Sequence, residues 1–315
     1  MSATALADEQ RLANYQAGAA LLERWIGDQL RYGFAALESD ARARLEAFAA
    51  LLTDAQLPGP AEALRSFASR VGVDADWAAD LLRELGYWHL LARLVQQPAR
   101  LAPYQLDGVL LALGLRVRRA ALTEEPPTHV QTWTCVGVTH SERAGVFARH
   151  TYWLGERRGL WAEQHEYNYG SPPAPSQTVV GDAGAFGMYV YPGGLPGRVA
   201  LPDKRRLARA EVAPPAFATL AEQRATNHRL LADQPWRRAG YFAVEGVEVR
   251  LTGDAVLLTD AAGEAVELPA DRDATSSWQL LAVAGAAPAH VYGTLLRGRL
   301  RVLAVWQAGR LTAID

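Results

Sequence analysis

The chain has 315 residues, enough for two domains, and its apolar (50%) and charged (21%) fractions are those of an ordinary globular protein. With 32 basic and 34 acidic side chains, the formal net charge of −2 excludes a global field that would draw the protein onto nucleic acid or an anionic membrane. The single cysteine, Cys135, excludes an intramolecular disulfide and any zinc site that needs several cysteines of this chain.

The first third of the sequence has the apolar spacing of amphipathic helices. From residue 6 to residue 37, apolar side chains recur at steps of three and four, as at Leu12, Tyr15 and Ala19. Further helices are predicted over residues 40–53, 61–71, 77–85 (continuing toward 95) and 104–113. The LPGP sequence at 57–60 and later prolines separate them, because proline ends a helix. We therefore predict a helical bundle or solenoid-like array over residues 1–120, with a linker at 116–127.

Residues 121–315 are predicted to form a β domain. Short runs of β-branched and aromatic residues recur there, and the first three, at 131–139, 145–154 and 159–167, have the pattern of an antiparallel meander. Further strands are predicted at 186–191, 241–250, 255–259, 264–268, 278–284, 290–296, 301–306 and 310–314. One helix is inserted near residues 218–232. The predicted fold class is α+β: an N-terminal all-helical domain, then a mostly antiparallel sheet, sandwich or partly closed barrel with one inserted helix.

Several segments carry a family likeness through their order and spacing. They include AGAALLERWIGDQLRYGFAAL (17–37), LLRELGYWHLLARL (81–94), HTYWLGERRGLWA (150–162), YVYPGGLPGRVAL (189–201) and LAEQRATNHRLLADQPW (220–236). In this order they resemble the region C-terminal to the zinc finger in bacterial SWIM zinc-finger family proteins. The CxC…CxH element that defines the family is absent from this sequence. Zinc binding is therefore carried over to no residue, and we expect the finger to lie on another chain or to be missing.

The resemblance implies a cytoplasmic, non-catalytic interaction or scaffold protein. Such proteins are similar to accessory factors that occur beside MoxR-type AAA+ ATPases and VWA-domain proteins, so a protein partner of one of these classes is implied. No enzyme activity and no cofactor are implied. We also expect no signal peptide and no membrane span, because a basic head before an apolar core is missing and no run of about 18 apolar residues occurs.

Basic and aromatic residues gather at two turns of the predicted β domain, in the GERRG turn with its flanking tryptophans and in the stretch DKRRLAR. Exposed tryptophan and arginine dominate the binding energy of protein interfaces. We predict a binding surface made of Trp153, Arg157, Arg158, Trp161, Lys204, Arg205 and Arg206. The alternative is structural: tryptophans in the core and solvated turns whose charge discourages edge-to-edge aggregation.

A second function hypothesis uses the same basic turns to bind single-stranded nucleic acid, through phosphate contacts and aromatic stacking. This hypothesis predicts an affinity that falls steeply with added salt, because bound phosphates release counterions. The even interspersion of acidic residues among the basic ones makes it the runner-up to protein binding.

A third hypothesis is an enzyme that uses Glu163, His165 or Cys135. Glu163 and His165 share one face of a predicted strand, so they could interact. Cys135, His140, His150 and His165 would form a metal site only if three strands placed them all on one side. The signatures GxSxG, HExxH and GxxxxGK(S/T) are absent. We therefore favour a buried Cys135 and structural histidines, and predict no catalytic residue and no metal site.

Overall fold

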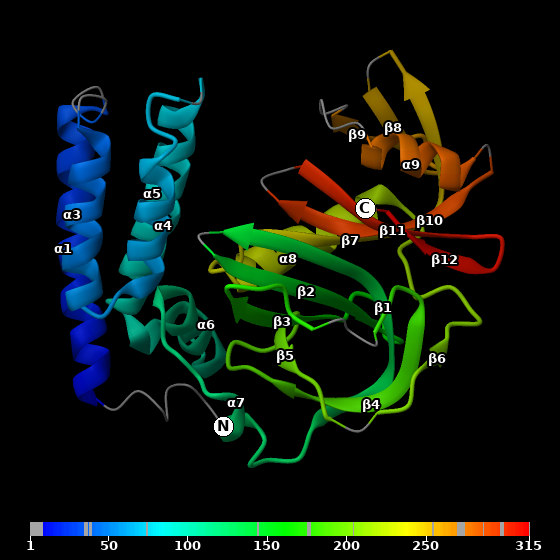
Figure 1. Ribbon diagram of the computed structural model, residues 1–315, viewed down its shortest axis with the longest axis horizontal. Helices are drawn as coiled ribbons and strands as arrows, with labels where there is room; N and C mark the ends of the chain where they lie inside the picture. The colour runs from blue at the N-terminus through cyan, green and yellow to red at the C-terminus, as the bar shows by residue number, and fades with distance from the viewer. Residues whose placement is uncertain are drawn as a thin grey trace. The chain divides into compact units, whose positions relative to one another are not determined.

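The computed structural model describes residues 9–34, 37, 40–73, 75–143, 145–174, 178–203, 205–253, 255–269, 275–285, 287–296 and 299–314 (Figure 1). The chain divides into two compact units. The helical unit consists of Met1–Arg118 and Gln234–Trp236, and the β unit consists of Arg119–Asp233 and Arg237–Asp315. A helical part thus precedes a strand-rich part, which confirms the predicted α+β fold class.

The helical unit is built from amphipathic helices whose apolar faces share one core. They are α1 (Glu9–Tyr32), α3 (Ala41–Asp54), α4 (Pro58–Ala68), α5 (Trp77–Val95) and α6 (Pro103–Leu113), with a 3-10 turn at Pro98–Arg100. Helix α3 packs against α4, α1 against α5, and α6 contacts both α4 and α5 (Figure 1). Leucines such as Leu22, Leu45 and Leu81 fill the core. None of the described helices has the length and apolar run needed to cross a membrane.

The start of α4 differs from the prediction. The helix begins at Pro58 rather than at residue 61. Proline is accepted in the first turn of a helix, because the amide hydrogen that it lacks would have no partner there. The LPGP sequence therefore opens a helix as well as closing the preceding one. Helix α6 opens on Pro103 in the same way and ends at Gly114, whose φ of 117° lies in the left-handed region.

The segment Gln234–Trp236 belongs to the helical unit although it is distant from the helices in sequence. The Tyr87 hydroxyl donates a hydrogen bond to the Trp236 carbonyl oxygen at 2.7 Å. The Trp236 ring lies so close to Gly108 of α6 that a Cβ at position 108 would come within 2.1 Å of ring atom Cε2. Only glycine permits this contact.

The division between the units falls inside the segment predicted as a linker. Within that segment, Arg119–Leu122 forms the short helix α7. The Arg119 guanidinium donates to the Leu201 carbonyl oxygen at 3.0 Å and to the Asp203 carboxylate at 2.7 Å. These bonds tie the first residue of the β unit to the segment that follows β5 (Gly197–Ala200).

The first sheet of the β unit closes on itself. In the described part of the chain it has six strands in the order β1-β2-β3-β5-β4-β6. An additional pairing of β1 with β4 closes strands β1, β2, β3, β5 and β4 into a ring, and β6 stays outside this ring. Among the described pairings of this sheet, that of β3 with β5 is parallel and the others are antiparallel. The predicted meander, β1 to β3, is confirmed. The remaining strand bounds are β1 (Thr128–Arg143), β2 (Val146–Gly155), β3 (Trp161–Tyr169), β4 (Asp182–Val190) and β6 (Ala208–Arg209).

The second sheet has the order β12-β11-β10-β7-β8-β9, with every described pairing antiparallel. Its strands are β7 (Ala239–Thr252), β8 (Ala255–Thr259), β9 (Ala265–Pro269), β10 (Ala289–Leu296), β11 (Arg299–Gln307) and β12 (Arg310–Ala313). The strand predicted at residues 278–284 is wrong, because helix α9 (Thr275–Ala284) lies there. Leu280 and Ala284, four positions apart, both face the core, and α9 packs on β7 and β11. Helix α9 is therefore a second inserted helix, in addition to the one predicted near residues 218–232.

Helix α8 (Leu220–Asp233) covers part of the edge of β7. The Asn227 side chain donates to the Tyr241 carbonyl oxygen at 2.8 Å and accepts the Tyr241 amide hydrogen at 3.1 Å. The Gln223 side-chain oxygen accepts the Ala243 amide hydrogen at 2.7 Å. Both amide side chains are buried. They replace the hydrogen bonds of a neighbouring strand, so this edge of β7 is not left open.

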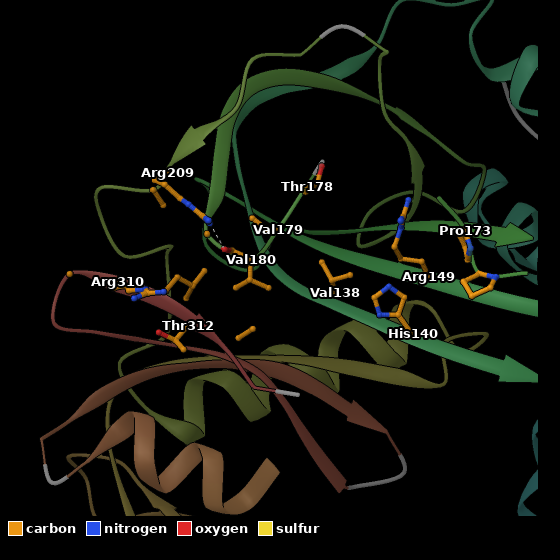
Figure 2. Close-up of a pocket in the computed structure, with 16 residues that line it drawn as sticks. Val138, His140, Arg149, Pro173, Thr178, Val179, Val180, Arg209, Arg310 and Thr312 are labelled. Atoms are coloured by element: carbon orange, nitrogen blue, oxygen red, sulfur yellow. Dashed lines mark hydrogen bonds between the residues drawn. The ribbon is translucent and has the colours of Figure 1, made fainter. Parts of the chain in front are cut away.

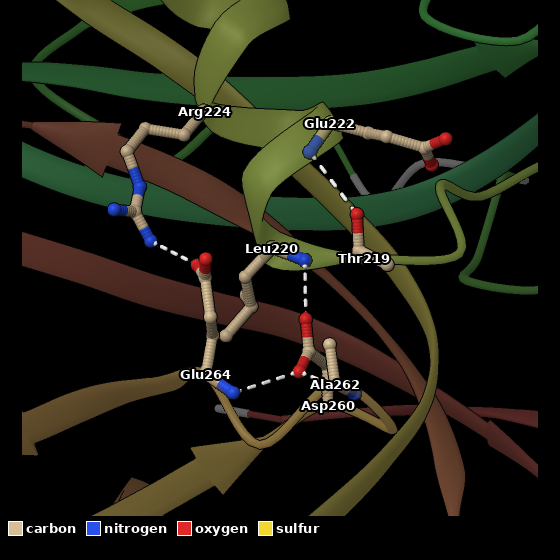
Figure 3. Close-up of polar contacts among 7 residues, drawn as sticks. All are labelled: Thr219, Leu220, Glu222, Arg224, Asp260, Ala262 and Glu264. Atoms are coloured by element: carbon tan, nitrogen blue, oxygen red, sulfur yellow. Dashed lines mark hydrogen bonds and ion pairs between the residues drawn. The ribbon is translucent and has the colours of Figure 1, made fainter.

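Asp260 holds the start of α8 against the turn between β8 and β9 (Figure 3). One carboxylate oxygen accepts the Leu220 amide hydrogen at 2.8 Å, and the other accepts those of Ala262 at 3.0 Å and Glu264 at 2.9 Å. Burial raises the carboxyl pKa, but these amide hydrogens outweigh it and leave the pKa of Asp260 below its usual value. An Arg224–Glu264 ion pair of 2.6 Å adds a second link between the same elements.

Candidate functional site

The cysteine and histidine residues that could have formed a metal site lie on two different faces of the ring wall. The register of β1 against β2 shifts between Cys135 and Gly137. Cys135 is paired with Trp153 and His140 with Arg149, on the inner face of the ring, whereas His150 and His165 are paired with each other on the outer face. No group of three or more metal-ligating side chains occurs in the described chain. Cys135 is fully buried, and burial raises the pKa of its thiol to about 12.

Trp153 and Trp161 do not form an exposed binding surface, which corrects the prediction for these two residues. Their exposed fractions are 0% and 1%. Trp153 lies inside the ring, edge-on to Phe186 with ring centroids 5.5 Å apart. Trp161 faces the second sheet and stacks on Tyr241 at 4.9 Å. At these two positions the first sheet is buried on both faces, so neither face of the strand provides contact with solvent.

The basic residues of the predicted surface are placed in different surroundings. Arg157 and Arg158 are exposed in the turn between β2 and β3, where the Arg158 guanidinium lies 5.7 Å from the Phe217 ring centroid. Arg206 is also exposed. Arg205 is half-buried and donates to the Pro202 carbonyl oxygen at 3.1 Å and to the Thr178 hydroxyl at 3.2 Å. Lys204 lies outside the described residues.

Glu163 and His165 form the pair that their shared face predicted. The Glu163 carboxylate contacts His165 Nε2 at 2.9 Å and accepts the Tyr241 hydroxyl hydrogen at 2.6 Å. The Arg237 guanidinium donates to the same hydroxyl oxygen at 3.3 Å. Glu163 and His165 belong to β3 of the first sheet, and Tyr241 belongs to β7 of the second. This polar network therefore joins the two sheets through their buried faces.

The network shifts the pKa values of its members in opposite directions. Burial raises the pKa of Glu163, but hydrogen bonds from His165 and Tyr241 outweigh it, so the net shift is downward. Burial, together with the Glu163 carboxylate, raises the pKa of the Tyr241 hydroxyl well above its ordinary value. Glu163 thus stays ionised and Tyr241 stays protonated at neutral pH. The Tyr241 hydroxyl donates its hydrogen to the Glu163 carboxylate, so the hydrogen-bonding capacity of each group is used by the other. This leaves little capacity for proton transfer to a substrate.

His150 lies beside this network. Its ring stacks on that of His165 with centroids 4.3 Å apart and planes inclined by 15°. Its Nε2 atom is buried without a hydrogen-bond partner in the described chain. Burial and the neighbouring His165 lower the pKa of His150 to about 4. The ring is therefore neutral in the folded protein at physiological pH.

We expect this protein to lose stability between pH 7 and pH 5, in part through His150. The unfolded side chain, with a pKa of about 6.5, takes up its proton before the folded one does, so the stabilisation is present above that pH and is lost as pH falls toward 4. Allowing for solvent screening, the loss from pH 7 to 5 should be about 1–2 kcal/mol. The measurement is the free energy of unfolding by urea at pH 7 and at pH 5, for the wild type and for His150→Phe. The phenylalanine keeps a stacking ring but has no titrating group. Equal losses in both proteins would contradict it.

A cleft of about 900 Å³ opens at the mouth of the ring (Figure 2). Strands β1 and β2 contribute Val138, His140 and Arg149, the segment between β3 and β4 contributes Pro172, Pro173 and residues 178–181, and Arg209 and Ala210 follow from the end of β6. The opposite wall is the β11–β12 turn with β12, residues 309–313. Val138 and Val180 lie in the middle, with Arg209 and Arg310 at one end and His140 and Arg149 at the other (Figure 2).

The described lining of this cleft contains basic side chains and no carboxylate. Arg149 is buried, and its guanidinium contacts Glu166 at 2.9 Å and the Ala174 carbonyl oxygen at 2.6 Å, so it holds the ring mouth together. Arg209 donates to the Val180 carbonyl oxygen at 2.7 Å, yet its side chain stays 67% exposed. Arg310 and His140 are exposed, and neither side chain makes a hydrogen bond or an ion pair to a described residue. The cleft is thus a mostly apolar groove with cationic ends.

The sequence indicated this cleft only in part. Arg209 belongs to the basic stretch singled out for binding, but Arg205 and Arg206 of the same stretch do not line the described cleft. Arg310 begins a correctly predicted strand, and its place opposite Arg209 depends on how the two sheets pack. Pro172 and Pro173, in the segment between β3 and β4, also line the cleft. No single motif joins these segments.

Comparison with known proteins identifies the helical part of the chain. Residues 10–113 match the family model described as the SWIM-associated four-helix bundle domain. No curated protein and no solved structure gives a match. The matched residues run from α1 to the end of α6, within the helical unit. Over this third of the chain, the predicted resemblance to the region that follows the SWIM zinc finger is confirmed, because residues 10–113 are similar to the SWIM-associated four-helix bundle domain.

Proposed function

We propose that this protein is a non-catalytic, cytoplasmic interaction protein that binds a protein partner through the cleft of its β unit. The observation that carries the proposal is the cleft itself: its Arg310 and His140 side chains are exposed and make no hydrogen bond or ion pair to a described residue, and its described lining holds no carboxylate. Acid–base catalysis needs a proton donor or acceptor that reaches the substrate. The strongest such groups, Glu163 and Tyr241, bond to each other between the sheets and do not line this cleft.

The domain content supports the same proposal. A helical bundle domain associated with SWIM zinc fingers precedes the β unit. The first candidates for the partner, from the family resemblance, are a MoxR-type AAA+ ATPase and a VWA-domain protein. In this scheme the β unit supplies the contact surface and the bundle domain provides a second surface for assembly.

Capture of the tagged protein from a lysate of its own host, with nuclease treatment and with or without ATP, tests the proposal. The wild type should retain a protein partner at a constant ratio after nuclease treatment. Arg310→Glu should lose that partner, because it reverses a charge in the cleft. Arg229→Glu is the matched control, since Arg229 is an exposed arginine on α8 that does not line the cleft.

Two outcomes would overturn the proposal. Recovery of nuclease-sensitive material alone would assign nucleic-acid binding instead, through the exposed Arg157, Arg158 and Arg206. That binding should weaken steeply with added salt. A partner held equally by the wild type and Arg310→Glu would keep protein binding but remove the cleft as its site.

A further inference from the structure

We infer that the cleft recognises an extended peptide segment that carries acidic side chains, and that Arg310 and Arg209 bind a carboxylate of that segment. This inference rests on the proposed function and names the chemistry of the partner. It follows from three features of the cleft: the placement of its charges, the apolar surface between them, and the fixed position of one arginine.

The charges select an anionic ligand. Arg209 and Arg310 come from different sheets of the β unit, β6 and β12, and lie at the same end of the cleft (Figure 2). A carboxylate placed between two guanidinium groups accepts several charge-assisted hydrogen bonds, which are about twice as strong as neutral ones. A basic ligand would meet only like charge among the described lining residues.

Arg209 is held ready for such a ligand. Its Nη1 atom donates to the Val180 carbonyl oxygen at 2.7 Å and lies 3.4 Å from the Asp182 carboxylate. These contacts fix the guanidinium at the cleft wall, while its side chain remains 67% exposed. Because Arg209 is already ordered, binding costs less conformational entropy there than at a mobile arginine. Arg310 provides a second guanidinium, and the described residues that line the cleft with it include no carboxylate.

The length and apolar character of the cleft favour a peptide over a small anion. Between the cationic ends lie Val138, Val179 and Val180, with Pro173 near His140 (Figure 2), and Leu311 and Pro172 also line the cleft. A phosphate or a free carboxylate would occupy one end and leave this apolar surface in water. An extended peptide places alternate side chains on one side, so an apolar residue can cover the valines while an acidic residue two positions away reaches the arginines.

The test is selection of a random hexapeptide library, displayed on phage, on the immobilised full-length protein. Enriched sequences should contain aspartate or glutamate two positions from a valine, isoleucine or leucine. For a fluorescein-labelled synthetic copy of the most enriched sequence, Arg310→Glu should weaken binding about tenfold by loss of charge-assisted hydrogen bonds. Arg229→Glu should change it less than about twofold, since surface charges away from a site contribute little. Selection on Arg310→Glu itself should enrich lysine or arginine at the acidic position.

Other outcomes overturn the inference. Enrichment without acidic residues, or binding that Arg310→Glu leaves unchanged, would remove the carboxylate contact. Displacement of the labelled peptide by inorganic phosphate or by a (dT)12 oligonucleotide at lower concentration than by unlabelled peptide would assign the cleft to phosphate instead. If the library gives no acidic peptide while lysate capture still depends on Arg310, the peptide chemistry fails and the proposed function stands. If acidic peptides bind but lysate capture yields no protein, the proposed function fails alone.

Discussion

Replacing Trp153 with alanine should lower the free energy of unfolding by about 3–5 kcal/mol, the usual cost of removing a large aromatic side chain from a core. Trp153 has no exposed surface and lies inside the ring with Trp133, Cys135 and Phe186. The ring interior is closed by hydrogen-bonded strands on every side, so neighbouring side chains can collapse only partly into the cavity. The midpoint of urea unfolding, followed by far-UV circular dichroism, measures the effect.

Trp278→Ala is the matched control for this prediction. Trp278 lies on α9 and is 58% exposed, so its loss should change the free energy of unfolding by less than about 0.5 kcal/mol. The two substitutions remove the same atoms from opposite surroundings. If Trp153→Ala kept the wild-type midpoint and instead lost a binding partner, the burial argument would be wrong and Trp153 would return to the binding surface.

The sequence predicted those parts of the fold that depend on neighbouring residues. Helix periodicity placed α1, α3, α5 and α6, and alternation with turn residues placed the meander β1 to β3. Closure of the ring depends instead on β1 pairing with β4 and on β3 pairing in parallel with the short strand β5. These pairings join residues distant in sequence and leave no local pattern. The prediction of a strand at residues 278–284 was wrong for a related reason, since a short apolar run fits a strand and a buried helix equally well.

Contacts between residues distant in sequence also limited the prediction of the candidate site. The shared face of Glu163 and His165 followed from the period of a strand, and the structure confirms their contact. Their partner Tyr241 lies 78 residues from Glu163, so no local pattern could supply it. The tryptophan prediction failed because a sheet that packs against a second sheet and also closes into a ring has no solvent-facing side at Trp153 or Trp161.

Glu163→Ala should lower the free energy of unfolding by about 3 kcal/mol, because removing a largely buried, hydrogen-bonded carboxylate leaves its two partners unsatisfied. The variant removes the acceptor of the Tyr241 hydroxyl and the partner of His165. Glu163→Gln keeps an acceptor of the same shape and should lose less. A double-mutant cycle with Tyr241→Phe should show a coupling of about 1–2 kcal/mol, as expected for residues in direct contact.

The pH dependence identifies the ionised form of Glu163 as the source of this stability. Its pKa in the folded protein lies below the ordinary value, so the stabilisation is present above about pH 4.3 and is lost as pH falls through the folded pKa. The difference between the wild type and Glu163→Ala should therefore be constant from pH 7 to about pH 5 and shrink below about pH 4. Unfolding free energies measured across this range check it.

A Glu163→Ala protein as stable as the wild type would contradict the structural role of the network. It would also reopen the enzyme hypothesis, because a largely buried carboxylate with a lowered pKa beside a histidine is a common acid–base arrangement. A loss that vanishes in the Tyr241→Phe background would place its cause in the buried hydroxyl. Glu163 and His165, which the sequence offered for catalysis, would then belong to the network that joins β3 to β7, and the cleft at the ring mouth would remain the proposed binding site.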